Sequence, residues 1–164
     1  MVGRAAVVRT LTAQLTRHRF VTIVGPGGMG KTTVALAVAE RVAQSYQDGV
    51  RFVDLAPVSD PDLVSAALAA ELALPSAPES RPSRIQAFLA DKQMLLLLDN
   101  CEHVAGTAAI LVEGILKAAP RVHVLVTSRE PVQAEGEWVS RLPSLETPSR
   151  SAALTARAAL AFPA

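Results

Sequence analysis

Apolar residues along the chain follow two different periods. Short apolar or β-branched runs, typical of buried strands, occur at 20–24, 50–55, 94–98, 122–128 and 137–142. The segments between them repeat apolar residues every three or four positions, which predicts helices at 31–46, 60–72, 84–90 and 104–119. Strands that alternate with helices form βαβ units. The pattern therefore predicts an α/β fold, a three-layer αβα sandwich around a mostly parallel five-stranded sheet.

Prolines and small polar residues set several boundaries between these elements. Asp60 is placed to cap a helix whose first residue is Pro61. Pro120 ends the helix that precedes the strand at 122–128. The stretch 75–83 is rich in proline and serine and is predicted to be a loop. Each of these boundaries agrees with the alternation of strands and helices.

The composition limits the classes of protein to which the chain can belong. Its 164 residues, half of them hydrophobic, suffice for one core, so we expect a domain at 1–145 and a linker with the start of another helix at 146–164. The 16 Lys and Arg against 15 Asp and Glu give no charge excess that would favour nucleic-acid binding by this segment. We see neither a secretory leader nor an apolar run of membrane-spanning length, so we expect a cytoplasmic protein with no membrane partner.

Residues that bind metals or react with oxidants are sparse. Cys101 is the one cysteine, which excludes an internal disulfide, and it is either a small buried filler or a redox-sensitive thiol. His18, His103 and His123 have no Cys or carboxylate partner at metal-ligand spacing. We therefore expect no structural metal site.

One glycine-rich stretch lies between a predicted strand and a predicted helix. The sequence GPGGMGKT fits the P-loop pattern G-x-x-x-x-G-K-[ST]. Glycines permit positive φ angles and let backbone N–H groups face a phosphate at the helix N-terminus. Lys31 is expected to reach the β- and γ-phosphates of a nucleotide, and Thr32 to give its hydroxyl to Mg²⁺. We predict this phosphate site, against the alternative of an ordinary glycine-rich turn, at Gly25, Pro26, Gly27, Gly28, Met29, Gly30, Lys31, Thr32 and Thr33.

A magnesium ion at a P-loop needs a second anionic ligand. The apolar run 94–98 is predicted to be a central strand, and it leads into Asp99. If that strand lies near the P-loop strand, the Asp99 carboxylate points toward the metal, which makes Asp99 the Walker B candidate. A cap that follows a core strand is the alternative role for Asp99. Asp54, which also ends an apolar strand, is the competing ligand.

Hydrolysis also requires a group that orients the attacking water. The residue after Asp99 is Asn100, whose amide orients water but cannot accept its proton, so we expect slow turnover. Glu102 is either a substitute base or a residue that complements the dipole of a first helical turn. Thr127 to Arg129 close another strand at the edge where α/β sheets bind ligands. Arg129 is therefore either a γ-phosphate contact or a solvated surface residue.

Four segments in this order and spacing resemble the STAND signal-transduction ATPases: VGR, GPGGMGKTT, LLLLDNCEH and LVTSRE. More narrowly they resemble the ATPase module of bacterial winged-helix transcriptional regulators, which is related to the NB-ARC domains. The resemblance covers the chain from Val2 to about residue 145. It implies ATP and ADP as ligands, with Val2, Gly3 and Arg4 near the adenine and ribose. It also implies that Arg129 senses the γ-phosphate and that exchange of ADP for ATP releases a closed, inactive form.

The sequence departs from that family at its two ends. The acidic residue that often follows VGR is missing, since Ala5 and Val7 occupy those positions, so adenine contacts there rest on the backbone alone. In the family this domain continues into a helical lid, a winged helix and often a repeat array. We therefore expect an excised domain, with 146–164 as the beginning of a truncated lid. DNA would be contacted only through a separate domain outside these residues, and an oligomer on activation is left open.

Three functions remain in competition. The first is a regulatory switch that binds ATP or ADP, hydrolyses ATP weakly and changes the conformation of attached domains. The second is a metabolic P-loop enzyme such as a small-molecule kinase, for which the loop 75–83 and its surroundings offer only Arg81 and Arg84 as phosphate-binding lid residues. The third is a module that holds a nucleotide without turnover, which Asn100 keeps open.

Overall fold

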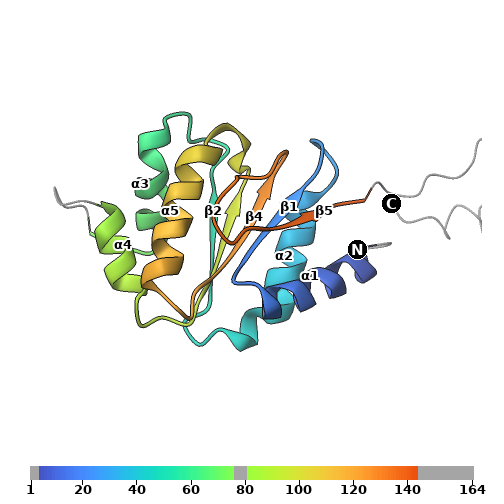
Figure 1. Cartoon of the computed structure of the whole chain (residues 1–164), viewed down its shortest axis with the longest axis horizontal. Coiled ribbons are helices and arrows are strands. Elements are labelled where there is room, and N and C mark those ends of the chain that lie inside the picture. The colour runs from blue at the N-terminus through green and yellow to red at the C-terminus, as the bar shows by residue number, and fades with distance from the viewer. Residues whose placement is uncertain (1–3, 76–80, 144–164) are drawn as a thin grey trace, which may run out of the picture.

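The computed structural model describes residues 4–75 and 81–143. Its centre is a sheet of five strands in the order β2-β3-β4-β1-β5, and every neighbouring pair is parallel (Figure 1). The predicted α/β fold is confirmed, and the sheet is entirely parallel. The strands are β1 (Phe20–Val24), β2 (Val50–Asp54), β3 (Leu95–Asp99), β4 (His123–Ser128) and β5 (Trp138–Arg141).

Helices cover both faces of the sheet. Figure 1 shows α1 and α2 on one side and α3, α4 and α5 on the other. Within the ranges that the structure describes, none of these helices has the length and apolarity needed to cross a membrane. The helices are α1 (Ala5–Arg17), α2 (Lys31–Val42), α3 (Val64–Glu71), α4 (Arg81–Leu89) and α5 (Ala105–Ala118), with short 3-10 turns at Ala43–Ser45, Pro61–Leu63 and Cys101–His103.

Two parts of the predicted secondary structure were wrong. Helix α1 was not predicted, although Val8, Leu11 and Leu15 recur at helical spacing and are buried in the structure. Helix α4 begins at Arg81, so the predicted loop at 75–83 overlaps its first turn. A proline in a first turn lacks an N–H that would have no partner there, which explains why Pro82 is compatible with this start.

The cap at Asp60 is confirmed. Its carboxylate accepts a hydrogen bond of 3.0 Å from the backbone N–H of Asp62, in the short 3-10 turn that leads into α3. The predicted helix at 31–46 divides into α2 and a 3-10 turn that follows it. Both outcomes leave the order of strands and helices as the sequence predicted.

The core has two halves, one on each face of the sheet. In β3, Leu96 and Leu98 pack in the cluster with α3, α4 and α5, whereas Leu95 and Leu97 pack in the cluster with α1 and α2. All residues of β1 and β3 are buried. A strand that is covered on both faces favours apolar residues at successive positions, which explains why Thr22 is the one polar residue within β1 and why β3 is apolar up to Asp99. Each fully buried leucine contributes about 2 kcal/mol to the free energy of folding.

The register of the strands brings their carboxyl ends to one edge. Val24 of β1 pairs with Ser128 of β4, Leu98 of β3 pairs with Val126 of β4, and Asp54 of β2 pairs with Asp99 of β3. Residues that end or follow these strands therefore meet at the same edge. In an open parallel sheet this is the edge at which ligands bind.

Candidate functional site

The glycine-rich stretch forms the turn between β1 and α2, at the upper edge of the sheet in Figure 1. Gly28 and Gly30 have φ angles of +75° and +79°, in the left-handed region that residues with a Cβ rarely adopt. Gly30 directly precedes the first residue of α2. The glycines are therefore required where the chain reverses into the helix, and the backbone N–H groups of the turn lie at the positive end of the helix dipole.

Lys31 is the first residue of α2 and directly follows this turn. Its side chain is almost buried, with 7% of the residue exposed, and its Nζ donates to the carbonyl oxygens of Gly25 and Pro26 at 2.9 and 3.1 Å. An ammonium group at a helix N-terminus adds positive charge where the helix dipole is already positive. The position therefore favours an anion, such as a phosphate, next to the amine.

The next residue, Thr32, contacts the end of β3. Its hydroxyl oxygen lies 2.9 and 2.8 Å from the two carboxylate oxygens of Asp99, and Asp99 is 2% exposed. A hydroxyl and a carboxylate are oxygen ligands of the kind that Mg²⁺ takes while it keeps several waters. The chemistry of this pair fits a magnesium ion, and the two side chains that would hold it are already side by side.

Two more side chains hold the Asp99 carboxylate. Thr127, at the end of β4, donates its hydroxyl to Oδ1, and the side-chain amide of Asn100 donates to Oδ2 at 3.0 Å. The backbone N–H of Asn100 in turn donates to the Thr127 hydroxyl at 3.0 Å. The sequence did not single out Thr127 as a site residue, yet it joins Asp99 and Asn100 in one network.

Asp54 takes part in this network only at its margin. Its carboxylate accepts hydrogen bonds from the backbone N–H of Ala56 at 2.9 Å and from the side-chain amide of Asn100 at 3.2 Å. The hydroxyl of Thr32 is bonded to Asp99 instead. The geometry favours Asp99 over Asp54 as the carboxylate that serves the P-loop.

Arg129 and Glu102 form an ion pair close to the P-loop. The Nε of Arg129 donates to the Oε1 of Glu102 at 3.0 Å, and a Cβ placed on Gly27 would lie 3.7 Å from the Arg129 Nη2. Arg129 follows β4, whereas Glu102 lies in the 3-10 turn after β3. The structure therefore brings together two residues that the sequence had singled out separately, and it places both beside the glycine-rich turn.

Cys101 is completely buried between these polar groups and the core. Its thiol lies 3.7 Å from the carbonyl oxygen of Leu98, and burial raises its pKa, with further contributions from the negative charges of Asp99 and Glu102. A buried thiol with a raised pKa forms little thiolate, the reactive species. These observations support a small buried filler rather than a redox-sensitive residue.

The N-terminal segment reaches the P-loop through Arg4. Its guanidinium is buried, with 5% of the residue exposed, and donates to the carbonyl oxygens of Met29 and Pro143 at 3.2 and 2.5 Å. Val2 and Gly3, the other two residues that the resemblance places near adenine, lie outside the described residues. Thr33 is exposed and lies beside Leu36 on the outer side of α2.

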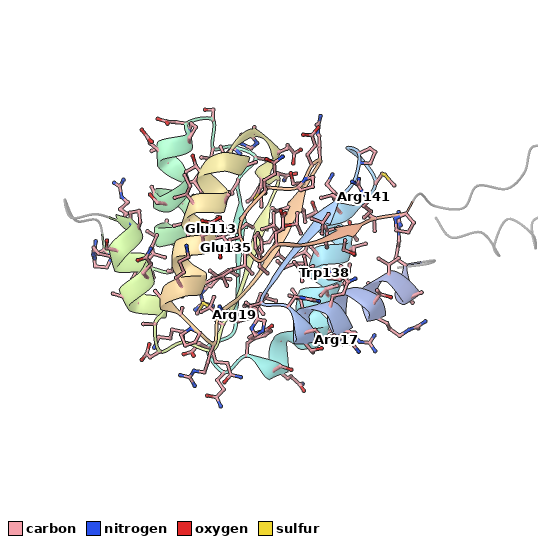
Figure 2. The ribbon with its side chains drawn as sticks, viewed as in Figure 1. Arg17, Arg19, Glu113, Glu135, Trp138 and Arg141 are labelled. Carbon is pink, nitrogen blue, oxygen red and sulfur yellow. The ribbon has the colours of Figure 1, made fainter. Side chains whose placement is uncertain are left out.

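The opposite edge of the sheet holds a hollow of about 620 Å³. Its lining has mixed charge, and Figure 2 shows Arg17 and Arg19 at the lower edge of the molecule with Glu113 and Glu135 on the side of α5. Most of these groups already have partners. Arg19 donates to the carbonyl oxygens of Leu116 and Ala119, and Glu135 forms an ion pair with Lys117. Nothing in the hollow matches the phosphate chemistry of the P-loop.

Histidines are not gathered with other metal-binding residues. Across residues 4–75 and 81–143, no group of three His, Cys, Asp or Glu side chains is placed to hold a metal ion. His18 stacks on the ring of Trp138, with 4.1 Å between the ring centroids. Among the residues singled out from the sequence, Thr32 and Asp99 are the pair whose oxygen atoms fit a metal ion.

Comparisons with known proteins agree with this fold. A family model described as an AAA domain matches residues 10–129, and the chain belongs to that family. A protein of Mycobacterium tuberculosis named as an HTH-type transcriptional regulator is 40% identical over 136 residues, which cover 82% of this chain and 15% of the relative. Regulatory protein AfsR of Streptomyces griseus is 30% identical over 141 residues, covering 77% of this chain and 14% of AfsR. The chain thus spans a small part of the length of these relatives.

Solved structures share the fold at low sequence identity. The STAND protein with a tetratricopeptide repeat sensor from Pyrococcus horikoshii is 14% identical with a TM-score of 0.60, over 89% of this chain and 24% of that one. The ORC2 protein of Aeropyrum pernix, solved as ADPNP–ADP complexes, is 12% identical with a TM-score of 0.60, over 86% of this chain and 48% of that one. The predicted membership among P-loop ATPase domains of bacterial regulators is confirmed.

Proposed function

We propose that this chain is a regulatory switch domain that binds ATP or ADP with Mg²⁺ and hydrolyses ATP slowly. One observation carries the proposal: the Lys31 amine is bonded to the carbonyl oxygens of the glycine-rich turn, and the adjacent Thr32 contacts the Asp99 carboxylate. This set combines a phosphate-binding turn, a fixed positive charge and two oxygen ligands for a metal. The ADPNP and ADP in a protein of the same fold support a nucleotide as the ligand.

Each residue of the set has a distinct task in this proposal. The backbone N–H groups of residues 27–30 and the Lys31 amine would hold the phosphates, while Thr32 and Asp99 would hold Mg²⁺. The ion, when bound, neutralises negative charge on the phosphate oxygens. Thr127 and Asn100 fix the Asp99 carboxylate by hydrogen bonds. Arg4 contacts the turn by donating a hydrogen bond to the Met29 carbonyl oxygen. Val2 to Arg4 are proposed to lie near adenine.

Slow hydrolysis follows from the residues available to orient water. The position after Asp99 holds Asn100, which is in the left-handed region with φ +60° and whose amide is bonded to Asp54 and Asp99. An amide accepts no proton from water. Glu102 has a carboxylate, but Arg129 is bonded to one of its oxygens. These observations also favour a second candidate function, a nucleotide-binding module without turnover.

The relatives suggest where such a switch acts. Because they are named as transcriptional regulators and are several times longer, we propose that this domain controls attached lid, winged-helix and sensor domains. DNA would be bound by a separate domain of the longer chain, in the cytoplasm, and activation could include an oligomer. The boundaries 1–145 and 146–164 remain part of this proposal.

Calorimetric titration of the chain with ATP and with ADP, each with and without Mg²⁺, tests the proposal, together with phosphate release measured over hours. A switch domain binds both nucleotides, binds ATP more tightly with Mg²⁺, and releases phosphate slowly. Binding with phosphate release at background favours the module without turnover. Failure of both nucleotides to bind overturns the proposed function. Brisk release would instead place the chain among metabolic enzymes.

A further inference from the structure

The ion pair between Glu102 and Arg129 joins two side chains of unequal exposure. It uses one atom of each side chain, Oε1 of Glu102 and Nε of Arg129, at 3.0 Å. The Arg129 side chain is 65% exposed, whereas that of Glu102 is 23% exposed. An exposed pair of this kind contributes little to folding, about 0.2–1 kcal/mol. Stability alone is therefore a weak explanation for its presence.

The second oxygen of Glu102 strengthens this conclusion. Its Oε2 atom is buried and has no hydrogen-bond partner among residues 4–75 and 81–143. A buried polar atom without a partner costs about 1–3 kcal/mol, which is more than the exposed pair returns. Such local costs concentrate at functional sites.

The ion pair with Glu102 fixes which nitrogen atoms of the Arg129 guanidinium remain free near the P-loop. Glu102 takes the Nε edge of the guanidinium, which leaves Nη1 and Nη2 without a hydrogen bond among the described residues. The Nη2 atom lies beside Gly27 of the P-loop, 3.7 Å from the place of a Cβ on that residue. A phosphate in the turn would thus meet the Nη2 group of Arg129 while the bond from Nε to Glu102 stays in place. A charged N–H donor of this kind suits a phosphate oxygen.

We propose that Glu102 is a positioning residue that holds Arg129 against the P-loop and thereby sets the preference for a triphosphate over a diphosphate. The inference rests on the proposed function. It gives Glu102 a task that differs from both a general base and a helix-dipole residue. Without the carboxylate, the exposed Arg129 side chain has many rotamers, and ordering it on the γ-phosphate costs conformational entropy. ADP has no γ-phosphate, so its affinity is independent of this ordering.

The test is a set of calorimetric titrations with ATP and with ADP in the presence of Mg²⁺. Glu102→Ala is expected to weaken ATP binding about three- to fivefold and to leave ADP binding within about twofold. The same substitution in an Arg129→Ala background is expected to add nothing to the loss. Glu40→Ala, an exposed glutamate on the outside of α2, is the control for removal of one negative charge.

Two conservative variants separate position from charge. Glu102→Gln keeps the reach of the side chain and an oxygen that accepts from Nε, whereas Glu102→Asp keeps the charge and withdraws the oxygen by one methylene group. Positioning predicts that Glu102→Gln retains more of the ATP preference than Glu102→Asp. The reverse order overturns the inference, as does a gain in ATP affinity in Glu102→Ala, which would mean that Glu102 competes with the phosphate.

The two proposals fail in different ways in this experiment. If the unaltered chain binds neither nucleotide, the proposed function is overturned and the inference with it. If the unaltered chain binds both, but all Glu102 variants keep its ratio of ATP to ADP affinity, only the inference is overturned. Thermal unfolding of each variant is measured alongside. If Glu102→Ala folds poorly, Glu102→Asp remains decisive, because positioning predicts that this variant loses part of the ATP preference that Glu102→Gln keeps.

Discussion

The hydroxyl of Thr32 and the carboxylate of Asp99 are in direct contact, with oxygen separations of 2.8 and 2.9 Å, although 67 residues separate them in sequence. Thr32 is the second residue of α2, the helix after β1, and Asp99 ends β3, which lies two strands away in the sheet. The contact requires a strand register in which the carboxyl ends of β1 and β3 lie at the same edge of the sheet. It therefore links the register of the parallel sheet directly to the chemistry of the site.

Thr127 is expected to stabilise this contact. Thr127→Val keeps the shape of the side chain but removes a donor to Asp99 and an acceptor for the Asn100 N–H. The two lost hydrogen bonds are made by the buried Thr127 hydroxyl, and Asp99 and the Asn100 N–H each lose that partner. We therefore expect the free energy of unfolding to fall by about 1–3 kcal/mol. Urea unfolding measures this loss, and the affinity for ATP with Mg²⁺ should fall as well because Asp99 is less fixed.

Thr22 provides a matched control on the neighbouring strand. Its side chain is also fully buried, but its hydroxyl has no hydrogen-bond partner among the residues that the structure describes. Thr22→Val therefore removes an unsatisfied polar group and is expected to leave stability unchanged or to raise it by up to about 1 kcal/mol. Equal destabilisation by Thr22→Val and Thr127→Val would contradict the role given to the Thr127 hydroxyl.

The glycines of the P-loop are expected to differ in their tolerance of alanine. Gly30 has a φ of +79°, which a residue with a Cβ adopts at a cost of roughly 1–2 kcal/mol. Gly27 has no positive φ, and its Cβ would make ordinary contacts of 3.7 Å or more with Arg129. Gly30→Ala should therefore lower the free energy of unfolding by about 1 kcal/mol, and Gly27→Ala by less. Chemical denaturation compares the two, and an equal effect would argue against the turn geometry described above.

His123 is expected to make stability depend on pH. Burial lowers its pKa below the ordinary value of 6.5, and the positive charge of Arg19 lowers it further. Its ring packs edge-on against Tyr46, with 5.4 Å between centroids. Between the lowered pKa and 6.5 the unfolded chain binds more protons than the folded one, so the free energy of unfolding falls as the pH drops below about 6.5.

His123→Phe keeps the aromatic contact and removes the titrating group. We expect this variant to lose less stability than the unaltered chain when the pH is lowered from about 7.5 to about 5. Thermal unfolding at a series of pH values measures the difference. The same slope in both proteins would show that His123 contributes nothing to it.

Much of the fold was predictable because its signals are local. The runs at β1 and β3 are mostly apolar, as is typical of strands covered on both faces, and they alternate with amphipathic helices. Helix α1 was missed because its buried stripe is thin: Val8, Leu11 and Leu15 are separated by polar residues such as Arg9 and Gln14. Its apolar spacing was a signal that could have been used.

The candidate site was predictable only in part. Lys31, Thr32 and Asp99 belong to local motifs, and the shared edge of the strands brings them together. The role of Thr127 depends on the register in which Leu98 pairs with Val126, since that register brings Thr127 level with Asp99. The pairing of Glu102 with Arg129 depends on the paths of two turns and on side-chain rotamers, which neither spacing nor composition determines.

The central claim is that the glycine-rich turn and Lys31 bind nucleotide phosphates, and Lys31→Ala tests it most directly. The control is Lys117→Ala, which removes an exposed lysine at the opposite edge of the molecule. In calorimetric titrations with ATP and Mg²⁺, we expect Lys31→Ala to abolish detectable binding while its thermal unfolding stays cooperative, and Lys117→Ala to bind as the unaltered chain does. Unchanged ATP affinity in a folded Lys31→Ala variant would contradict the P-loop assignment and the function built on it.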